Sequence, residues 1–414
     1  MRAGGRRAAI AWCLYDWANS AFPTVVSTFV IAAYFTRAVA ESPEKGQSQW
    51  AWAMALAGLA VAVLAPVLGG LADRVGPRKP WLAGFTLLAA AASAGLWVVR
   101  PDAASVLPAL VLVAVGSIGF EMALVFYNAM LPEVAATDRM GRLSGWAWGL
   151  GYAGGLTCLL IALFGLVRGE PPPFGLDPAA AESVRATGFL VAAWMLAFAV
   201  PLFLWVPDRG RVAPEAVPGW RRILRLLRQR PDVTRFLVAR LLYTDGLNTL
   251  FAFGGIYAAG TFDMTVQTVM AFGIAMNVAA GLGAAAFAWV DDWLGSRRTV
   301  TLGLMGMMTF GAILLVISGK VWFWVFALPL GIFFGPVQAA SRTLLARLAP
   351  PESRAELYGL YALSGKITAF AGPAVLGWVT AWTASQRAGM ATILLFLGGG
   401  LWVLWRTPLT EKHG

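Results

Sequence analysis

The sequence contains very few of the residues that support metal binding or histidine-based catalysis. Its 414 residues include one histidine, His413, and two cysteines, Cys13 and Cys158. Histidine is the commonest metal ligand and the usual acid–base group near neutral pH, so both kinds of chemistry have almost no material here. Both cysteines lie in apolar stretches, which predicts small core residues and no disulfide framework. We therefore expect neither a metal nor a cofactor.

Charged side chains are also scarce. They make up 13% of the residues, whereas an ordinary soluble domain has about 25%. Hydrophobic residues make up 59%, with 19 tryptophans and 24 phenylalanines, and the mean hydropathy is +0.69. So few charges cannot cover a soluble fold of this size. Because a spanning helix needs about 20 apolar residues, the composition predicts an all-α membrane protein with many spans.

The apolar runs divide the chain into twelve predicted transmembrane helices. The first run follows Arg6 and Arg7 as a signal peptide would, but Asp16 and Asn19 interrupt it, so we expect a retained helix. The runs lie at about 10–36, 49–72, 81–99, 105–131, 143–167, 186–206, 234–259, 266–290, 299–318, 321–341, 356–380 and 387–405.

Lysine and arginine residues lie mostly on one side of this predicted layout. The side that carries both termini has 23 of them, the opposite side has seven, and Arg240 and Lys366 fall within spans. The positive-inside rule therefore places both termini in the cytoplasm, for which a bacterial inner membrane is the expected setting. The same bias explains the net charge of +11 without any nucleic-acid partner.

The two halves of the chain repeat the same features in the same order. Asp16 and Asn19 recur 229 positions later as Asp245 and Asn248, and the loop 73–79 recurs 219 positions later as 292–298. Leu143, Gly145 and Gly151 recur 214 positions later. These offsets predict two parallel six-helix halves, 1–206 and 233–414. They are joined by a cytoplasmic linker, 207–232, whose basic amphipathic stretch 220–228 is expected to lie along the membrane surface.

Several motifs carry a resemblance to a known family. Residues 69–79, GGLADRVGPRK, resemble the loop after helix 2 of the major facilitator superfamily. Further stretches resemble the vacuolar amino-acid effluxer-like family of that superfamily, which includes fungal autophagy proteins. The resemblance implies the major facilitator fold and export of a solute, with amino acids the usual proposal. These stretches are 15–22, 126–133, 149–155, 243–249, 338–342 and 361–366.

Ionisable residues within the predicted spans are candidates for binding substrate or a coupling proton. A charge at mid-span is costly and normally faces a cavity or a partner. In the fold that the resemblance implies, helices 1, 4, 7 and 10 line the central cavity. A purely structural role as interhelical hydrogen-bonding groups remains open for each candidate. With the neighbouring amides, the candidate set is Asp16, Asn19, Glu121, Asn128, Asp245, Asn248, Gln338 and Lys366.

Lys366 is the sharpest single candidate, because it falls near the middle of predicted helix 11, too deep to reach the membrane surface easily. Asp16, Asp245 and Glu121 are each possible partners, and the sequence does not choose among them. The lysine could form a structural ion pair, hold a substrate carboxylate or switch a coupling carboxylate.

A second group of candidates lies in the predicted cytoplasmic loops and is expected to form a gate. Ion pairs there would close the cytoplasmic side and break when that side opens. Simple positive-inside anchoring explains part of the same charge. The gate candidates are Asp73, Arg74, Gly76, Arg78, Lys79, Glu133, Asp292, Arg297 and Glu356.

Three functions remain open at this stage. The first is a monomeric secondary transporter, a proton-linked exporter of amino acids or similar small polar solutes. The second is a cation-coupled sugar or lysolipid carrier of the same fold, and the third is a transporter-like sensor. An enzyme is not expected: the chain has neither the G-x-G-D of intramembrane aspartyl proteases nor a P-loop for ATP.

Overall fold

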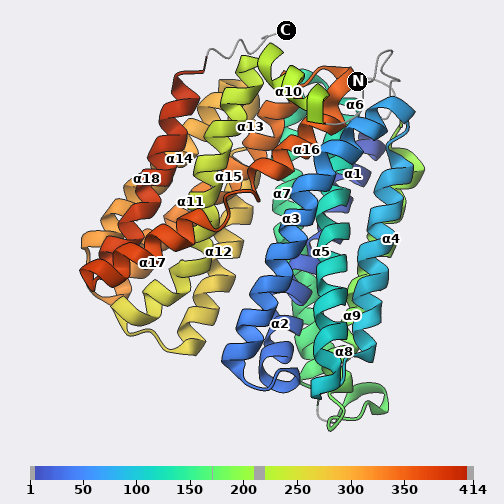
Figure 1. The fold of residues 1–414 in the computed structure, drawn as a ribbon, viewed down its shortest axis with the longest axis vertical. Coiled ribbons are helices and arrows are strands. Elements are labelled where there is room, and N and C mark those ends of the chain that lie inside the picture. Colours follow the sequence, from blue (N-terminus) through green and yellow to red (C-terminus); the bar gives the residue numbers. More distant parts are fainter. Residues whose placement is uncertain (1–4, 170, 209–219, 408–414) are drawn as a thin grey trace.

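The computed structural model describes residues 5–169, 171–208 and 220–407, and within these ranges the chain is helical without a β-strand. His413, Lys412, Arg2 and residues 209–219 of the predicted linker lie outside the described residues. Two groups of helices stand side by side, one formed by α1 to α9 and the other by α11 to α18 (Figure 1).

The first group begins with α1 (Gly5–Asn19), which continues through two π-helical segments to Val39. Ser42 caps the start of α3 by accepting a hydrogen bond from the Lys45 N–H, and Gly76, with a φ of 100°, follows the end of α3. The elements are η1 (Phe22–Phe29), α2 (Ile31–Tyr34), η2 (Phe35–Val39), α3 (Pro43–Val75), α4 (Lys79–Gly95), η3 (Leu96–Val98), η4 (Ala103–Ser105), α5 (Val106–Ala129), α6 (Leu131–Val134), η5 (Thr137–Arg139), α7 (Met140–Leu160), η6 (Ile161–Val167), η7 (Pro173–Gly175), α8 (Glu182–Arg185) and α9 (Thr187–Trp205).

The second group follows the short basic helix α10 (Trp220–Gln229), which lies at the same end of the molecule as the first turn of α1 and the last turn of α18 (Figure 1). Its elements are α11 (Pro231–Phe262), α12 (Val266–Ala286), α13 (Ala288–Leu294), α14 (Ser296–Val316), α15 (Lys320–Leu348), η8 (Pro351–Ser353), α16 (Arg354–Ser364), α17 (Ala371–Thr383) and α18 (Gln386–Trp405).

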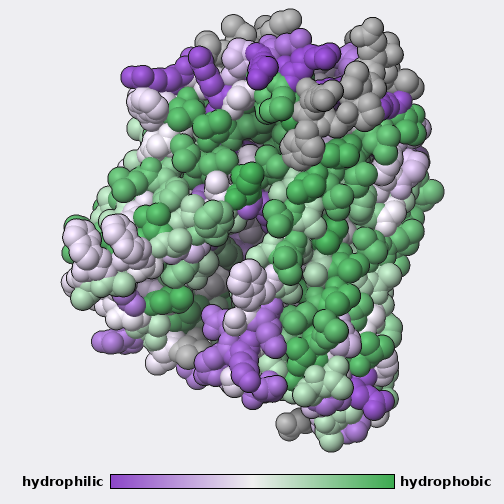
Figure 2. All heavy atoms as spheres, in the orientation of Figure 1, coloured by the Kyte–Doolittle hydropathy of each residue, from purple (hydrophilic) through white to green (hydrophobic). Residues whose placement is uncertain are grey.

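Ten helical segments among the described residues are long and apolar enough to cross a membrane. They coincide with ten of the twelve predicted spans, so the chain is a multi-pass membrane protein. The other two predicted spans are 234–259, where α11 carries buried charged residues, and 356–380, where the helix is interrupted. The number twelve stays a prediction, as do the domain boundaries at 206 and 233. On the face that Figure 2 shows, hydrophobic residues cover most of the middle of the molecule and hydrophilic residues gather mainly toward its two ends.

The prediction that Lys366 lies in the middle of a continuous helix is wrong. The helix stops at Ser364 and resumes at Ala371, and α17 runs at a clear angle to α16 (Figure 1). Arg240 explains the interruption. Its Nη1 donates to the Tyr361 carbonyl oxygen at 2.5 Å, and the Gly365 N–H bonds the carbonyl of Ala362 instead. In a continuous helix the Tyr361 carbonyl would accept its hydrogen bond from the Gly365 N–H, but here it accepts one from the Arg240 side chain.

Close contacts between the two groups occur where repeated glycines meet a neighbouring backbone. A Cβ on Gly145 of α7 would lie 2.5 Å from the carbonyl oxygen of Ala284 in α12. A Cβ on Gly359 of α16 would overlap the carbonyl oxygen of Ala65 in α3. The two glycines are repeat partners in the sequence, and each allows one helix of its group to approach the other group.

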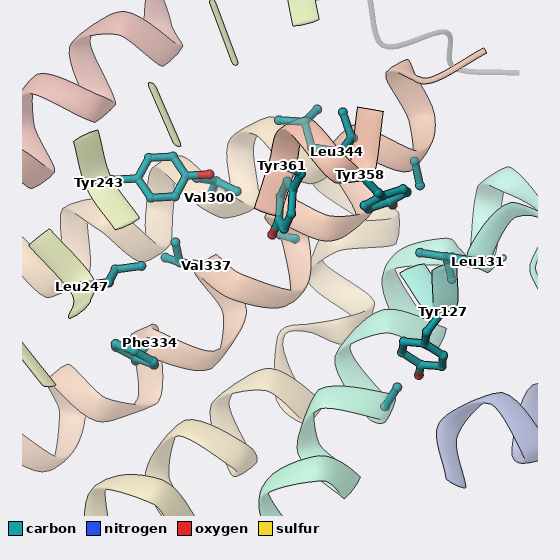
Figure 3. Packing of buried hydrophobic residues seen from close by; sticks show 14 of the residues in the cluster. Tyr127, Leu131, Tyr243, Leu247, Val300, Phe334, Val337, Leu344, Tyr358 and Tyr361 are labelled. Atoms are coloured by element: carbon teal, nitrogen blue, oxygen red, sulfur yellow. The ribbon is translucent and has the colours of Figure 1, made fainter. Parts of the chain in front are cut away.

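Buried tyrosines in the core form hydrogen bonds between their hydroxyl groups and neighbouring helices. Tyr243 shares a 2.7 Å hydrogen bond between its hydroxyl and Ser341 Oγ, and Tyr358 donates to the carbonyl of Arg342 at 2.8 Å. Figure 3 shows these rings together with Tyr127 and Tyr361 among the packed aliphatic side chains. Because a buried tyrosine hydroxyl needs a partner, these bonds fix the positions of α11, α15 and α16.

Candidate functional site

A polar cavity of about 1540 Å³, part of it open to solvent, lies between the two groups of helices. It reaches from Asp16 and Arg342 at one end to Thr28 and Phe29 at the other. Of the eight predicted substrate or coupling residues, Asp245 does not line it. The seven that do are Asp16, Asn19, Glu121, Asn128, Asn248, Gln338 and Lys366.

Glu121 and Lys366 face each other across this cavity. Glu121 comes from α5, and Lys366 comes from the interruption between α16 and α17. The Lys366 Nζ lies 2.6 Å from the Glu121 Oε1, so Glu121 is the partner that the sequence left open among three carboxylates. The side chains are 34% and 24% exposed, and the pair is therefore within reach of a solute in the cavity.

A second ion pair, largely buried, lies at the end of the cavity nearest the termini. The Arg342 Nη1 lies 2.9 Å from the Asp16 Oδ2, and the same guanidinium donates to the Ser144 side chain and carbonyl oxygen. The guanidinium also stacks over the Trp12 ring, with 4.8 Å from Cζ to the ring centroid. This pair joins α1 of the first group to α15 of the second.

Sequence reasoning missed Arg342 as a site residue. It lies near the end of predicted helix 10, and we counted it among the cytoplasmic positive charges. In the structure it is buried in α15, with only 2% of its surface exposed. The signal that could have found it is its position one helical turn after Gln338, within the same motif of the resemblance.

Asp245 occupies a different environment from the cavity residues. Its Oδ2 accepts a 3.0 Å hydrogen bond from the Gly372 N–H, in the first turn of α17. Its Oδ1 is buried without a hydrogen-bond partner. The nearby Arg240 is used elsewhere: its guanidinium lies over the Tyr361 ring and donates to Ser364 Oγ at 2.7 Å. The carboxylate thus holds the N-terminus of α17, where the helix dipole favours a negative charge.

Amide and aromatic side chains complete the cavity wall. Both side-chain amide atoms of Asn19 are buried without a hydrogen-bond partner, and Trp148 and Tyr152 line the same space. Trp17 is not among the residues that line this space, and its ring packs on Trp194 with 5.6 Å between ring centroids. Two aromatic rings therefore line the cavity, next to a buried amide that has no hydrogen-bond partner.

The end of the cavity nearest the termini is closed by a network around Asp73, the last acidic residue of α3. Its two carboxylate oxygens accept hydrogen bonds from the Ala355 and Glu356 N–H groups, at 3.1 and 2.9 Å, in the first turn of α16. Arg78 bonds Asp73 at 3.1 Å and also pairs with Glu133. Gly76, at its positive φ, lets the chain turn back so that Arg78 can make these contacts.

The other predicted gate residues of this loop lie close by but make different contacts. Glu356 pairs with Arg222 of α10, with 3.1 Å between Nε and Oε2. Arg74 keeps its Nε buried without a hydrogen-bond partner. The Nζ of Lys79 donates to the Phe203 carbonyl oxygen at 2.7 Å, in α9 of its own group. The loop thus turns the Lys79 side chain back toward α9.

The repeated loop of the second group forms a matching network. Asp292 accepts a 2.8 Å hydrogen bond from the Gly141 N–H at the start of α7, and it pairs with Arg142 at 3.1 Å. Arg347 of α15 lies 3.1 Å from Asp291 and 3.6 Å from Asp292. Arg297, which we expected in this gate, donates to the Trp405 carbonyl oxygen at the end of α18.

Comparison of the sequence with known proteins finds similarity to transporters. A model of the family described as vacuole effluxer Atg22 like matches residues 44–413. The uncharacterized MFS-type transporter YxiO of Bacillus subtilis is 27% identical over 399 residues, covering 94% of this chain and 92% of that protein. Autophagy-related protein 22-1 of Penicillium rubens is 25% identical over 274 residues, 58% of this chain but only 44% of the fungal protein.

Among solved structures, the major facilitator superfamily transporter FucP in its outward conformation superposes with a TM-score of 0.79. The alignment covers 98% of this chain and all of FucP, at 12% sequence identity. At that identity the likeness concerns the fold alone. It agrees with the major facilitator arrangement that the sequence motifs predicted.

Proposed function

We propose that the chain, which belongs to the vacuole effluxer Atg22-like family as its motifs predicted, is a secondary active transporter. It would export small zwitterionic solutes, with amino acids the first candidates. Its homologues are transporters of the major facilitator superfamily. The observation that carries the choice of solute is the Glu121–Lys366 pair, which is partly exposed inside the cavity.

This pair has the charges that a zwitterion needs. An amino acid could place its carboxylate on Lys366 and its ammonium on Glu121, so that one ion pair is exchanged for two. The cost of separating the two side chains is then offset by the contacts that each makes with the solute. A solute with only one charge would leave one partner unpaired in a low-dielectric cavity, which is unfavourable. The rings of Trp148 and Tyr152 line the cavity and are available to the rest of the solute.

We propose alternating access of the two halves, 1–206 and 233–414, as the transport mechanism. The Asp73 and Asp292 networks close the end that carries the termini, and the cavity lies beyond them. With the termini in the cytoplasm, this arrangement is an outward-facing state. Opening the cytoplasmic side would pull α16 from α3 and α7 from α13, and would break both networks together.

We assign proton coupling to the carboxylates that change partner in this cycle. Asp16 is neutralised by Arg342 across the two groups of helices, so separation of α1 from α15 would leave its charge uncompensated. A carboxylate without its cation in a low dielectric binds a proton more readily. Asp245 would act with it by releasing the N-terminus of α17 when it is neutral.

The test is a transport screen in proteoliposomes, with amino acids, dipeptides and sugars as solutes, at two pH values and with or without sodium. Glu121→Gln and Lys366→Ala should each abolish most counterflow of the solute that wild type transports. The matched control is the exposed surface pair Lys45 and Glu41, 2.5 Å apart, where Lys45→Ala and Glu41→Gln should leave counterflow unchanged. Full counterflow by both cavity variants would contradict the proposed binding site.

A second candidate is a lysolipid carrier of the same fold, and one feature favours it. An apolar space of about 1140 Å³ adjoins the polar cavity, and Phe29, Phe251 and Asn277 line both. Such a space could hold an acyl chain while the Glu121–Lys366 pair holds a zwitterionic head group. Lysophospholipid included in the same screen separates the two candidates, because an amino-acid exporter would show no counterflow of it.

A further inference from the structure

A groove on the outside of the molecule lies beside the second gate network and is separate from the central cavity. It is formed by the first turns of α1, the segment after α6 and the first half of α7, and it measures about 1660 Å³, part of it open space. Ile10, Leu14 and Leu143 lie along its apolar wall with Trp146 and Leu150. Ile10 and Trp146 are about half exposed, so this wall is available to a ligand.

Positive charge gathers at one rim of the groove. Arg6, Arg139 and Arg142 line it together with a single carboxylate, Asp138. Asp138 lies 3.6 Å from Arg139 in an exposed pair, which is a weak interaction. Arg142 reaches Asp292 through its Nε while its side chain stays 45% exposed. The three guanidinium groups are opposed by two carboxylates, Asp138 in the groove and the Asp292 that pairs with Arg142, so the rim keeps a net positive charge.

The order of these features along the helices matches the depth profile of a phospholipid. The arginines stand at the starts of α1 and α7, where spanning helices leave the membrane, and the apolar wall continues along the same helices toward their middle. Basic sites at such positions attract anionic head groups, and the neighbouring apolar surface can hold the acyl chain. We propose that this groove binds an anionic phospholipid of the leaflet on the side of the termini.

The bound lipid would also act on transport through Arg142. A phosphate on the outer edge of this guanidinium would hold the arginine in place while its Nε stays on Asp292, because one planar guanidinium can serve two anions. The lipid would therefore stabilise the closed Asp292 network and slow opening on that side. This consequence rests on the proposed transport cycle, whereas lipid binding itself does not.

The test of binding is lipid retention by the purified full chain, measured by native mass spectrometry after exposure to phosphatidylglycerol or phosphatidylethanolamine. Wild type should retain phosphatidylglycerol in preference. The double variant Arg6→Gln/Arg139→Gln should bind it about 25-fold more weakly, since each surface arginine contributes about fivefold. The control, Arg225→Gln/Arg228→Gln on exposed positions of α10, removes the same charge at the same end and should bind as wild type does.

The acyl-chain part of the proposal is tested by Ile10→Gln, which should weaken phosphatidylglycerol binding without removing a charge. Equal retention of the two lipids by wild type, or unchanged retention by Arg6→Gln/Arg139→Gln, would overturn the lipid site. A loss equal in the α10 control would also overturn it, because binding would then follow total charge. Absence of transport in every lipid mixture would contradict the proposed function and leave the binding result standing.

Discussion

Asp73 and Asp292 lie 219 positions apart, and each accepts hydrogen bonds from backbone N–H groups at the start of a helix in the other group. Asp73 holds the first turn of α16, and Asp292 holds the first turn of α7. A carboxylate at a helix N-terminus is stabilised by the unsatisfied N–H groups and by the helix dipole. The repeated loops therefore make the same kind of contact twice, once from each side of the interface.

Asp73→Asn should weaken closure at the end that carries the termini. The amide keeps the shape of the carboxylate but loses its negative charge, which attracts both the first turn of α16 and Arg78. We expect the lost attraction to cost the closed state about 1–2 kcal/mol. The open state should gain population accordingly, and substrate affinity should stay within a few-fold of wild type. Distances between spin labels on α3 and α16 would report the shift.

Asp292→Asn should produce the same shift, because its contact with α7 is equivalent. The matched control is Asp232→Asn, which removes a carboxylate that pairs with Arg230 at the same end but does not join the two groups. A collapse of substrate affinity with unchanged label distances would show that Asp73 and Asp292 are not gate residues.

Arg342→Ala should be the most destabilising single change in the site. It leaves Asp16 buried without its cation, and breaking a buried pair in this way typically costs about 3–5 kcal/mol. The melting temperature in detergent should fall clearly. The double variant Asp16→Asn/Arg342→Met should recover part of the loss, because no buried charge is left unpaired. Equal melting temperatures for wild type and Arg342→Ala would contradict the assignment.

Asp245→Asn should separate driven transport from exchange. The amide imitates the protonated carboxylate and weakens the hold on the N-terminus of α17, so proton-driven accumulation should be lost while counterflow continues. Transport into proteoliposomes with and without a pH gradient measures both modes. Asp263→Asn, at the exposed end of the same helix, is the control and should behave as wild type does. Normal accumulation by Asp245→Asn would leave the residue a structural cap.

Alkaline-phosphatase fusions test the membrane orientation. Fusions after Arg222 should be inactive, because the positive-inside bias places the segment around α10 in the cytoplasm. A fusion near Asp177 should be active, because that segment lies between two spans on the other side. Activity after Arg222, or inactivity near Asp177, would contradict the twelve-span layout.

The sequence was informative where charged residues interrupt apolar spans. Glu121 and Lys366 stood out for that reason, and both line the cavity. The repeat also predicted that Gly145 and Gly359 are equivalent, and each proved to be a close contact between the two groups. These features depend on local composition and on internal offsets, which a single sequence displays directly.

Features that depend on contacts distant in the sequence were not predictable. Whether Lys366 meets Asp16, Asp245 or Glu121 depends on how α5 approaches the interruption before α17. That interruption depends in turn on Arg240, which takes a carbonyl of a helix 121 positions away. In the sequence, Arg342 follows an apolar run as a surface arginine would. Only the packing of α1 and α7 against α15 shows that it is buried.

Binding of matched analogues is the most direct test of the central claim, that Glu121 and Lys366 hold the two charges of a zwitterion. Calorimetry would compare the transported amino acid with analogues that lack either the carboxylate or the ammonium group, on wild type, Glu121→Gln and Lys366→Ala. We predict that Lys366→Ala loses affinity only for solutes with a carboxylate, and Glu121→Gln only for solutes with an ammonium group. Equal losses for all three solutes on both variants would contradict the claim, because the pair would then support the fold and not the solute.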